Sequence, residues 1–414
     1  MRWKTIQLGL ASAAILGAGL LASPAATQSG SGPVARYTMD AGTMAGMAAM
    51  GAQGKGGLGG ALGMMRGGGG NVAHELLLKL GSSRAPTGAP KGDHFLPAGV
   101  KMGPSVPLVT PVQQPGTPGI PGGEMPRGRL LLFWGCGEHA GPGQPVVIDF
   151  AKLAKGQVPP DLFAAAVNIP EEWRVTPANS RTYGDWPNGT DGKQVPANAS
   201  LLGAHKVTSS YSPDIGFTLD QDFMAPLEVR SSALASGAFA MNWNAVPGAT
   251  GYYAWVMSAK DMGRKGNPDM VWWTSSASQA FGGPMWDWLS PAAVAKLVAA
   301  KTVMPASQTS CTVPAEVKQA GGEAMMANMY AYGPERDFSY PPRPPKVKVW
   351  SPEWIARVRF RSTSMTLLGM DMGAMGMPGS RSGQESSSSE PAPSTKPKCK
   401  GLKGVAMRAA GLCE

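Results

Sequence analysis

The residues of this sequence with the clearest chemical character are methionines that recur at short spacing. One set lies in the stretch MTLLGMDMGAMGM and consists of Met365, Met370, Met372, Met375 and Met377. A similar set nearer the start of the chain consists of Met39, Met44, Met47 and Met50. Thioether sulfur is a soft ligand that suits Cu(I), and a few flexible methionines can surround one ion. The spacing makes copper the candidate cofactor, held by residues 365–377, with residues 39–50 as a second contributor.

The methionine stretch 365–377 resembles the Met-rich motifs of periplasmic copper-handling proteins, and the resemblance implies Cu(I) binding. Those motifs often carry histidine as well, whereas here no histidine lies nearby. The competing interpretation is that methionine serves as a flexible apolar side chain in a segment biased towards Ala, Gly and Met.

A second group of candidate binding residues lies in the segments VWW and MWDWL. Its members are Trp272, Trp273, Trp286, Asp287 and Trp288. Indole faces beside a carboxylate can stack on a sugar ring and hydrogen-bond to it. This pattern indicates a carbohydrate-binding surface, and the competing interpretation is that these side chains pack in a β-sandwich core.

The elements that position these residues are clearest in the stretch 241–257, MNWNAVPGATGYYAWVM. Residues 240–244 alternate apolar and polar side chains, as a half-buried strand does. Pro247 and Gly248 begin a turn, because Pro presets φ and Gly permits positive φ. An aromatic-rich run follows, which suits a packed strand. The block W-x-x-V-P-G-A-T-G-Y, from Trp243 to Tyr252, resembles strands B and C of fibronectin type III domains.

The resemblance extends, in weaker form, over about 227–364 and implies a β-sandwich. The implied further strands are Leu227–Arg230, Met270–Thr274, Thr309–Pro314, Met325–Gly333 and Ile355–Ser362. Met325 stands where the family has a tyrosine, so the usual tyrosine corner is missing. A helical insertion is expected over Pro291–Ala300, with Ser290 as its N-cap and Pro291 at its first position.

The two ends of the chain have the composition of non-globular segments. Residues 1–25 combine Arg2 and Lys4 with an apolar run and small residues, which predicts a signal peptide. Residues 26–127 are rich in Gly, Pro and Met, which predicts a disordered arm with one short helical island over Val72–Leu80. Residues 365–398 form a Met-rich and then Ser/Pro-rich linker, and residues 399–414 form a basic tip.

Between these ends, residues 128–223 and 224–364 are expected to form two β-rich domains. The first shows strand-like runs at Leu130–Gly135, Pro145–Phe150, Ser200–Ser209 and Gly216–Asp220, with a short helix over Asp161–Val167. The sequence thus predicts a mainly β fold: two small sandwich-like domains with a helical insertion, between disordered arms.

Four cysteines permit three pairings if all are oxidised. Cys399 and Cys413 bracket the C-terminal tip and are expected to pair. Cys136 and Cys311 then either pair across the folded region or stay free and buried. The sequence contains no C-x-x-C, H-E-x-x-H, G-x-S-x-G or P-loop motif. These absences favour a protein without catalytic activity.

The formal charge of +10 lies mainly in the tails, and the folded middle is nearly neutral. This distribution argues against a nucleic-acid groove. No second long apolar run follows the signal, so no stable transmembrane segment is expected in the mature chain. We therefore expect an exported, periplasmic or extracellular, non-catalytic binding or scaffold protein, with an envelope protein or glycan as partner. Copper binding and carbohydrate binding are the alternatives.

Overall fold

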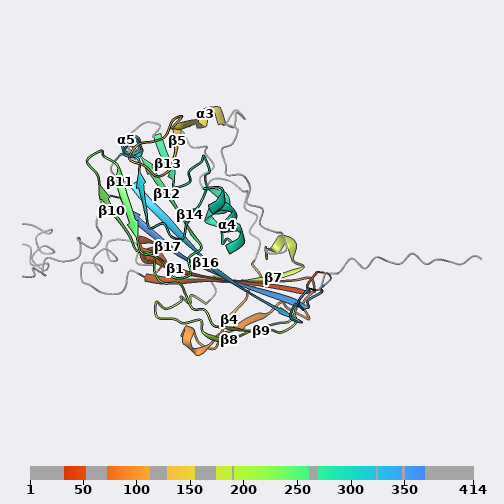
Figure 1. The fold of residues 1–414 in the computed structure, drawn as a ribbon. Helices are drawn as coiled ribbons and strands as arrows, with labels where there is room; N and C mark the ends of the chain where they lie inside the picture. Colours follow the sequence, from red (N-terminus) through yellow and green to blue (C-terminus); the bar gives the residue numbers. More distant parts are fainter. Residues whose placement is uncertain are drawn as a thin grey trace, which may run out of the picture. The chain divides into compact units, whose positions relative to one another are not determined.

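The computed structural model describes residues 32–52, 72–111, 128–153, 174–188, 191–260, 269–322, 325–346 and 350–368. These residues all belong to one compact unit of the chain. They form mostly strands with a few short helices, so the predicted mainly β fold is confirmed. Figure 1 shows the long strands β1, β16 and β17 running through the middle of this unit.

Ten of the described strands form one large sheet. Its order is β6 (Val146–Asp149), β5 (Arg129–Trp134), β13 (Asp269–Thr274), β12 (Gly251–Ala259), β16 (Met325–Tyr340), β17 (Trp354–Leu367), β1 (Ala35–Gly46), β2 (Val72–Ser82) and β7 (Thr182–Trp186), with β14 (Met304–Pro305) against β12. Strand β17 pairs antiparallel with β16 and parallel with β1. The long strands β16, β17 and β1 therefore lie side by side in the middle of the sheet and connect its two ends.

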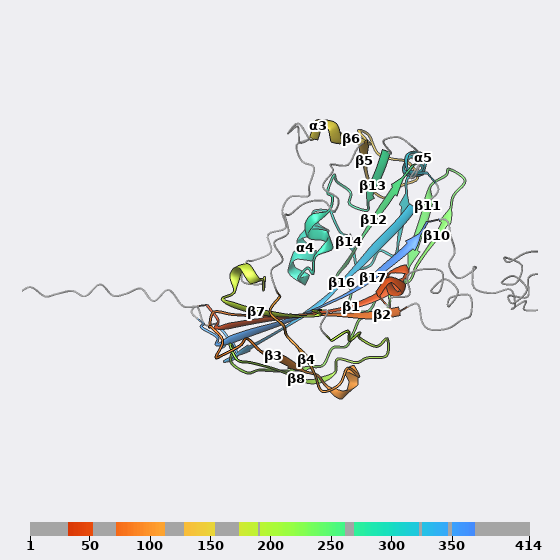
Figure 2. The same cartoon turned by 180° about the vertical axis from the view of Figure 1, so that it is seen from behind.

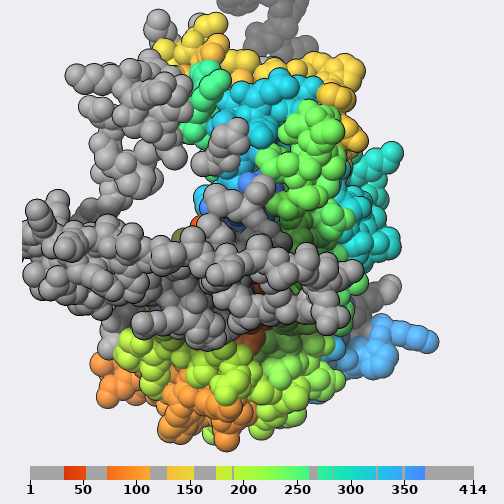
Figure 3. Space-filling view, turned by 90° about the vertical axis from the view of Figure 1, so that its left-hand side faces the viewer, coloured from red at the N-terminus to blue at the C-terminus, as the bar shows by residue number. Residues whose placement is uncertain are grey.

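Two smaller sheets cover one face of the large sheet, which we call the inner face. The three-stranded sheet has the order β10 (Val229–Ala233), β11 (Phe239–Trp243) and β15 (Ser310–Val313). The four-stranded sheet has the order β4 (Ser105–Pro107), β3 (Gly92–Phe95), β8 (Gly203–Ser209) and β9 (Ile215–Leu219). One buried apolar cluster contains residues of all three sheets. In Figure 3 the strands β10 and β11, in green, lie above the yellow-green and orange residues of the four-stranded sheet.

Alternation along the strands separates this inner face from the outer face. In β17 the side chains of Ala356, Val358 and Phe360 are buried in the apolar cluster. The intervening residues of β17 include Arg357, Arg359 and Arg361 and point away from it, because successive side chains of a strand face opposite sides.

The helices and 3-10 turns among the described residues are short. They are α1 (Met47–Ala52), α3 (Phe150–Leu153), α4 (Pro291–Ala299), α5 (Ala315–Gly321) and the 3-10 turns η1 (Ala98–Val100), η3 (Pro177–Asn179) and η4 (Gly283–Trp286). The predicted insertion is confirmed as α4: the Ser290 hydroxyl accepts from Ala293 N at 3.2 Å. Val294 and Leu297 of α4 pack in a second cluster with Tyr253 and Tyr332. Figures 1 and 2 both show α4 on the side of β12 and β16 opposite to β10 and β11.

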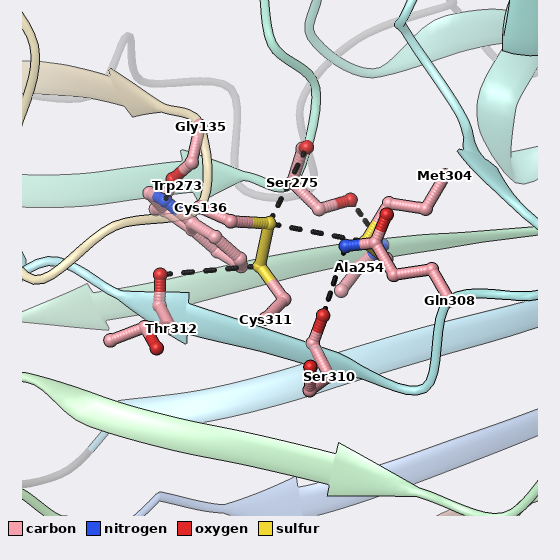
Figure 4. Close-up of a disulfide and its surroundings, with 10 residues drawn as sticks. All are labelled: Gly135, Cys136, Ala254, Trp273, Ser275, Met304, Gln308, Ser310, Cys311 and Thr312. Atoms are coloured by element: carbon pink, nitrogen blue, oxygen red, sulfur yellow. Dashed lines mark hydrogen bonds between the residues drawn. A yellow bond between two sulfur atoms is a disulfide. The ribbon is translucent and has the colours of Figure 1, made fainter.

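Cys136 and Cys311 form a disulfide, one of the two outcomes expected for this pair. Figure 4 shows the bond reaching from the loop after β5 to strand β15, so it ties the large sheet to the three-stranded sheet. Beside it, Trp273 Nε1 donates to Gly135 O at 2.9 Å. The structure shows no free cysteine among the residues it describes. Cys399 and Cys413 lie outside those residues.

The prediction of a disordered arm over 26–127 is wrong for the described residues 32–52 and 72–111, which contribute β1 to β4. Strand β1 is paired on both sides, with β17 and β2, so its backbone groups and small apolar side chains are buried together. The helical island is also a strand: Leu76, Leu78 and Leu80 face the core of the sheet. Local composition indicated disorder because it does not show that β1 pairs with a distant strand: Ala35 of β1 is the register partner of Trp354 of β17.

The division into domains 128–223 and 224–364 also needs correction. Strands β5 and β6 join one edge of the large sheet, β7 joins the other edge, and β8 and β9 belong to the four-stranded sheet. The strand-like runs expected at Leu130–Gly135, Pro145–Phe150, Ser200–Ser209 and Gly216–Asp220 correspond to β5, β6, β8 and β9. They pair as β5–β6 and β8–β9, but β5 also pairs with β13 and β8 with β3, which lie outside 128–223. The expected helix Asp161–Val167, the signal segment 1–25 and the tip 399–414 lie outside the described residues.

Candidate functional site

A groove of about 990 Å³ lies where β1 begins and where β16 ends and β17 begins. We call it the hairpin groove. Its lining combines guanidinium groups, aromatic rings and one carboxylate, and includes Arg36, Asp337, Phe338, Arg343, Trp350, Trp354 and Arg357. Its volume falls within the range typical of ligand sites, about 300–1,000 Å³.

The two ends of the hairpin place aromatic rings along this groove. Arg343 lies over the Trp350 ring, with 5.5 Å between the guanidinium carbon and the ring centroid. Trp350 Nε1 donates to Pro341 O at 3.2 Å, which holds the indole against the loop. Tyr340 is 56% exposed and stacks on Trp354, which is almost buried. Trp350 and Trp354 fit no motif in the sequence, so sequence reasoning missed this surface.

The charges of the hairpin groove are unevenly neutralised. Arg357 binds Asp337 at 2.8 Å and Glu335 at 3.5 Å. Burial raises the pKa of Glu335, and the nearby Arg357 opposes that shift. Within the described residues, by contrast, no carboxylate forms an ion pair with Arg36 or Arg343. The buried Nε of Arg36 also lacks a hydrogen-bond partner there. The groove therefore offers two positive groups to a ligand.

The structure separates the five residues expected to form one sugar-binding surface. Trp273 is fully buried on the inner face, and Trp288 is only 7% exposed. Trp286 is 39% exposed and lies against Trp255 and Trp272, with ring centroids 5.5 Å apart in each pair. Asp287 is exposed beside it. The expected five-residue surface therefore reduces to one exposed indole on an aromatic base.

Trp288 has a structural role on the outer face. The Arg361 guanidinium lies 3.8 Å from the Trp288 ring centroid and binds Glu75 Oε1 at 2.9 Å. Glu75 of β2 reaches Arg361 of β17 across Gly42 of β1, where any Cβ would lie 2.4 Å from the Glu75 side chain. Gly42 is therefore required because a side chain passes over it.

A neighbouring ion pair is buried. Asp40 of β1 accepts two hydrogen bonds from Arg359 of β17, at 2.7 and 2.9 Å. Arg359 also donates to Trp288 O at 2.7 Å. Its pKa is raised: burial opposes the charge, and the ion pair with Asp40 outweighs that opposition. These contacts fix the segment before α4 to the central strands.

The methionines of the predicted copper sites are placed only in part. Met365 is partly exposed near the end of β17, whereas Met370, Met372, Met375 and Met377 lie outside the described residues. Met39 is fully buried in the core, and Met44, Met47 and Met50 are partly exposed. Among the residues that the structure describes, no three His, Cys, Asp or Glu side chains gather as a metal site.

A buried polar chain crosses the layer between β1 and the four-stranded sheet. His205 Nε2 donates to Leu201 O at 2.8 Å, which leaves Nδ1 of the neutral ring to accept from His94 Nε2 at 3.0 Å. His94 Nδ1 then accepts from the Tyr37 hydroxyl at 2.6 Å. Burial lowers the pKa of both histidines. Sequence reasoning missed this chain because its residues are far apart and fit no motif.

Comparison with protein-family models, with curated proteins and with solved structures found no match to this chain. None of the helices within the described ranges is long and apolar enough to cross a lipid bilayer.

Proposed function

We propose that this chain is an exported, non-catalytic binding module that holds an acidic glycan in the hairpin groove. The observation that supports it best is that Arg36, Arg343 and the indole of Trp350 line one groove. Neither arginine has a carboxylate partner among the described residues. A guanidinium group binds carboxylates in a planar, two-bond geometry. An indole supplies an apolar face to which a sugar ring can stack. An acidic sugar carries both partners in one unit.

We also propose that the end of the molecule built from β10 to β17 is a fibronectin type III-like sandwich. Strands β10, β11 and β15 form one layer, and β13, β12, β16 and β17 follow one another in the other. Trp243 packs between them against Tyr252, and the Tyr252 hydroxyl accepts from Val246 N at 2.9 Å. Such sandwiches serve as scaffolds for many functions, so this likeness supports a binding role without naming a ligand.

The test of glycan binding compares two forms of one polymer. Isothermal titration of the mature chain with polygalacturonate is expected to show binding that weakens with salt, because exposed charges are screened. Fully methyl-esterified polygalacturonate keeps the sugar and loses the charge, and it is expected to bind at least tenfold more weakly. Equal binding of the two polymers would contradict recognition by Arg36 and Arg343.

Variants assign the binding to the groove. The double variant Arg36→Gln/Arg343→Gln is expected to lose at least tenfold in affinity, and Trp350→Ala a similar factor. The matched control Arg129→Gln/Arg230→Gln removes the same charge from β5 and β10 and should bind as the parent does. Trp286→Ala tests the exposed indole of the aromatic cluster on the outer face. If Trp286→Ala alone abolishes binding, the site is the aromatic cluster and not the hairpin groove.

Tighter binding of poly-glutamate than of polygalacturonate would identify an acidic protein as the ligand.

A further inference from the structure

The outer face of the large sheet carries three methionines at adjacent positions on adjacent strands. Met257 of β12 is the direct register partner of Met326 of β16. On the next strand, Met365 of β17 is the partner of Asn328, two residues along β16 from Met326. All three side chains are partly exposed and alternate with residues that face the core.

This register brings the sulfur atoms within reach of one ion. Direct cross-strand partners have Cβ atoms about 5 Å apart, and diagonal neighbours are about 7 Å apart. A methionine side chain is unbranched and flexible, so its sulfur can move towards a common point. Met326 lies between Met257 and Met365, and the common point lies above it.

The surroundings of these methionines favour a soft monovalent ion. Trp272 is the register partner of Met257, and Trp255 is the partner of Asn328. Trp286 stacks on Trp272 and lies tilted against Trp255, so aromatic rings border the methionines and can attract a cation. In the register of these strands the outward neighbours also include Leu367, Thr363, Asn328 and Ala259, none of which is charged. Thioether donors without carboxylates or imidazoles select Cu(I) and similar soft ions over Zn²⁺, Mg²⁺ or Ca²⁺.

From these observations the geometry points to a Cu(I) site formed by Met257, Met326 and Met365 on the outer face of the sheet. The site is independent of the hairpin groove. It also differs from the copper site expected from the sequence alone, since only Met365 belongs to both. Its other two ligands come from β12 and β16, and neither belongs to the methionine stretches 39–50 and 365–377 of the sequence analysis.

The test is a competition titration of the full mature chain with Cu(I) against a chromophoric chelator. A parallel titration uses Ag(I), with tryptophan fluorescence as the readout. One ion per chain and quenching of the nearby indoles are expected. The variant Met257→Leu/Met326→Leu/Met365→Leu is expected to lose at least tenfold in affinity and to lose the quenching. Leucine keeps the size and apolar character of each side chain, and the unfolding midpoint verifies that the variant is folded.

Two control variants decide whether the site is on the sheet. Met39→Leu changes a buried methionine of the inner face and should bind as the parent does. The second control removes the other methionines of the copper site predicted over residues 365–377. This variant, Met370→Leu/Met372→Leu/Met375→Leu/Met377→Leu, should change the affinity less than twofold. Parental affinity in the sheet variant would overturn the proposal. An equal or larger loss in the tail variant would overturn it as well. Neither result bears on glycan binding, which is measured in the absence of metal.

Discussion

The two ends of the large sheet are covered in physically different ways. At one end the three-stranded sheet packs through apolar and aromatic residues such as Trp243 and Met241, and the Cys136–Cys311 disulfide fastens it. At the other end the four-stranded sheet has no disulfide among the described residues, and the buried chain Tyr37–His94–His205 crosses its core. The same central strands thus support one covalently fastened layer and one layer that depends on satisfied polar groups.

The largest effect is expected from a change in the strands that both ends share. Asp40→Ala removes the partner of the buried Arg359 guanidinium between β1 and β17. An uncompensated buried charge costs about 3–5 kcal/mol, and denaturant unfolding measures this loss. Asp337→Ala breaks a pair whose carboxylate is 58% exposed. This control is expected to cost about 1 kcal/mol or less. Equal losses in the two variants would show that the Asp40 pair does not hold the shared strands together.

The next effect separates the two ends. Cys136→Ser/Cys311→Ser removes the link across 175 residues and is expected to cost about 2–4 kcal/mol in unfolding free energy. Hydrogen exchange should show the loss first in β10, β11 and β15, because the bond fastens that layer. A uniform increase in exchange over both small sheets would contradict the idea that the layers are held separately.

At the end of the large sheet that the four-stranded sheet covers, the corresponding substitution is at His94. His94→Leu leaves the Tyr37 hydroxyl and His205 Nδ1 without their buried partner. Each unsatisfied buried group costs about 1–3 kcal/mol, and exchange should rise in β3 and β8 while β10 and β11 keep their protection. Protection that falls equally in β10 would show that the ends do not respond independently.

Acid should weaken the same end. His94 and His205 have pKa values lowered by burial, so the folded chain stays neutral there while the unfolded chain takes up protons. The contribution of these two neutral histidines to the unfolding free energy is fully present above the unfolded pKa of about 6.5 and is lost as pH falls below it. We expect the unfolding free energy to fall between pH 7.5 and pH 5. The slope should be smaller in His94→Phe/His205→Phe, and an unchanged slope would exclude these two rings as its source.

The smallest effect concerns the insertion on the outer face. Ser290→Ala removes the N-cap hydrogen bond of α4 and is expected to cost about 1 kcal/mol. Ser290→Asp keeps an acceptor at the cap and is the matched control. A loss in Ser290→Asp as large as that in Ser290→Ala would mean that the cap hydrogen bond does not stabilise α4.

Sequence reasoning identified the parts of the fold that depend on neighbours in the chain. The strands β11 and β12 follow from the alternation and the aromatic-rich run on either side of the turn at Pro247 and Gly248, and α4 follows from Ser290 and Pro291. The parts that it missed depend on distant partners. Asp40 and Arg359 are 319 residues apart, and no local pattern around Asp40 indicates a strand buried between two others.

The candidate sites follow the same rule. Met365 belongs to an obvious methionine motif, yet its structural neighbours Met257 and Met326 lie in strands far from that motif in the sequence. The hairpin groove was missed for the same reason, because Arg36 and Arg343 line one groove only after β1 has paired with β17.

The position of β1 also sets a constraint on the order of folding. Strand β1, among the first described residues, lies between β2 and β17, and β17 ends the described part of the chain. A chain growing from its N-terminus therefore cannot complete the large sheet until residues 354–367 are present. Contacts between such distant segments slow folding, because a long loop must close before they form. Residues of β17 pack in the apolar cluster that all three sheets share. Neither small sheet therefore has its complete packing partner until β17 has joined the large sheet.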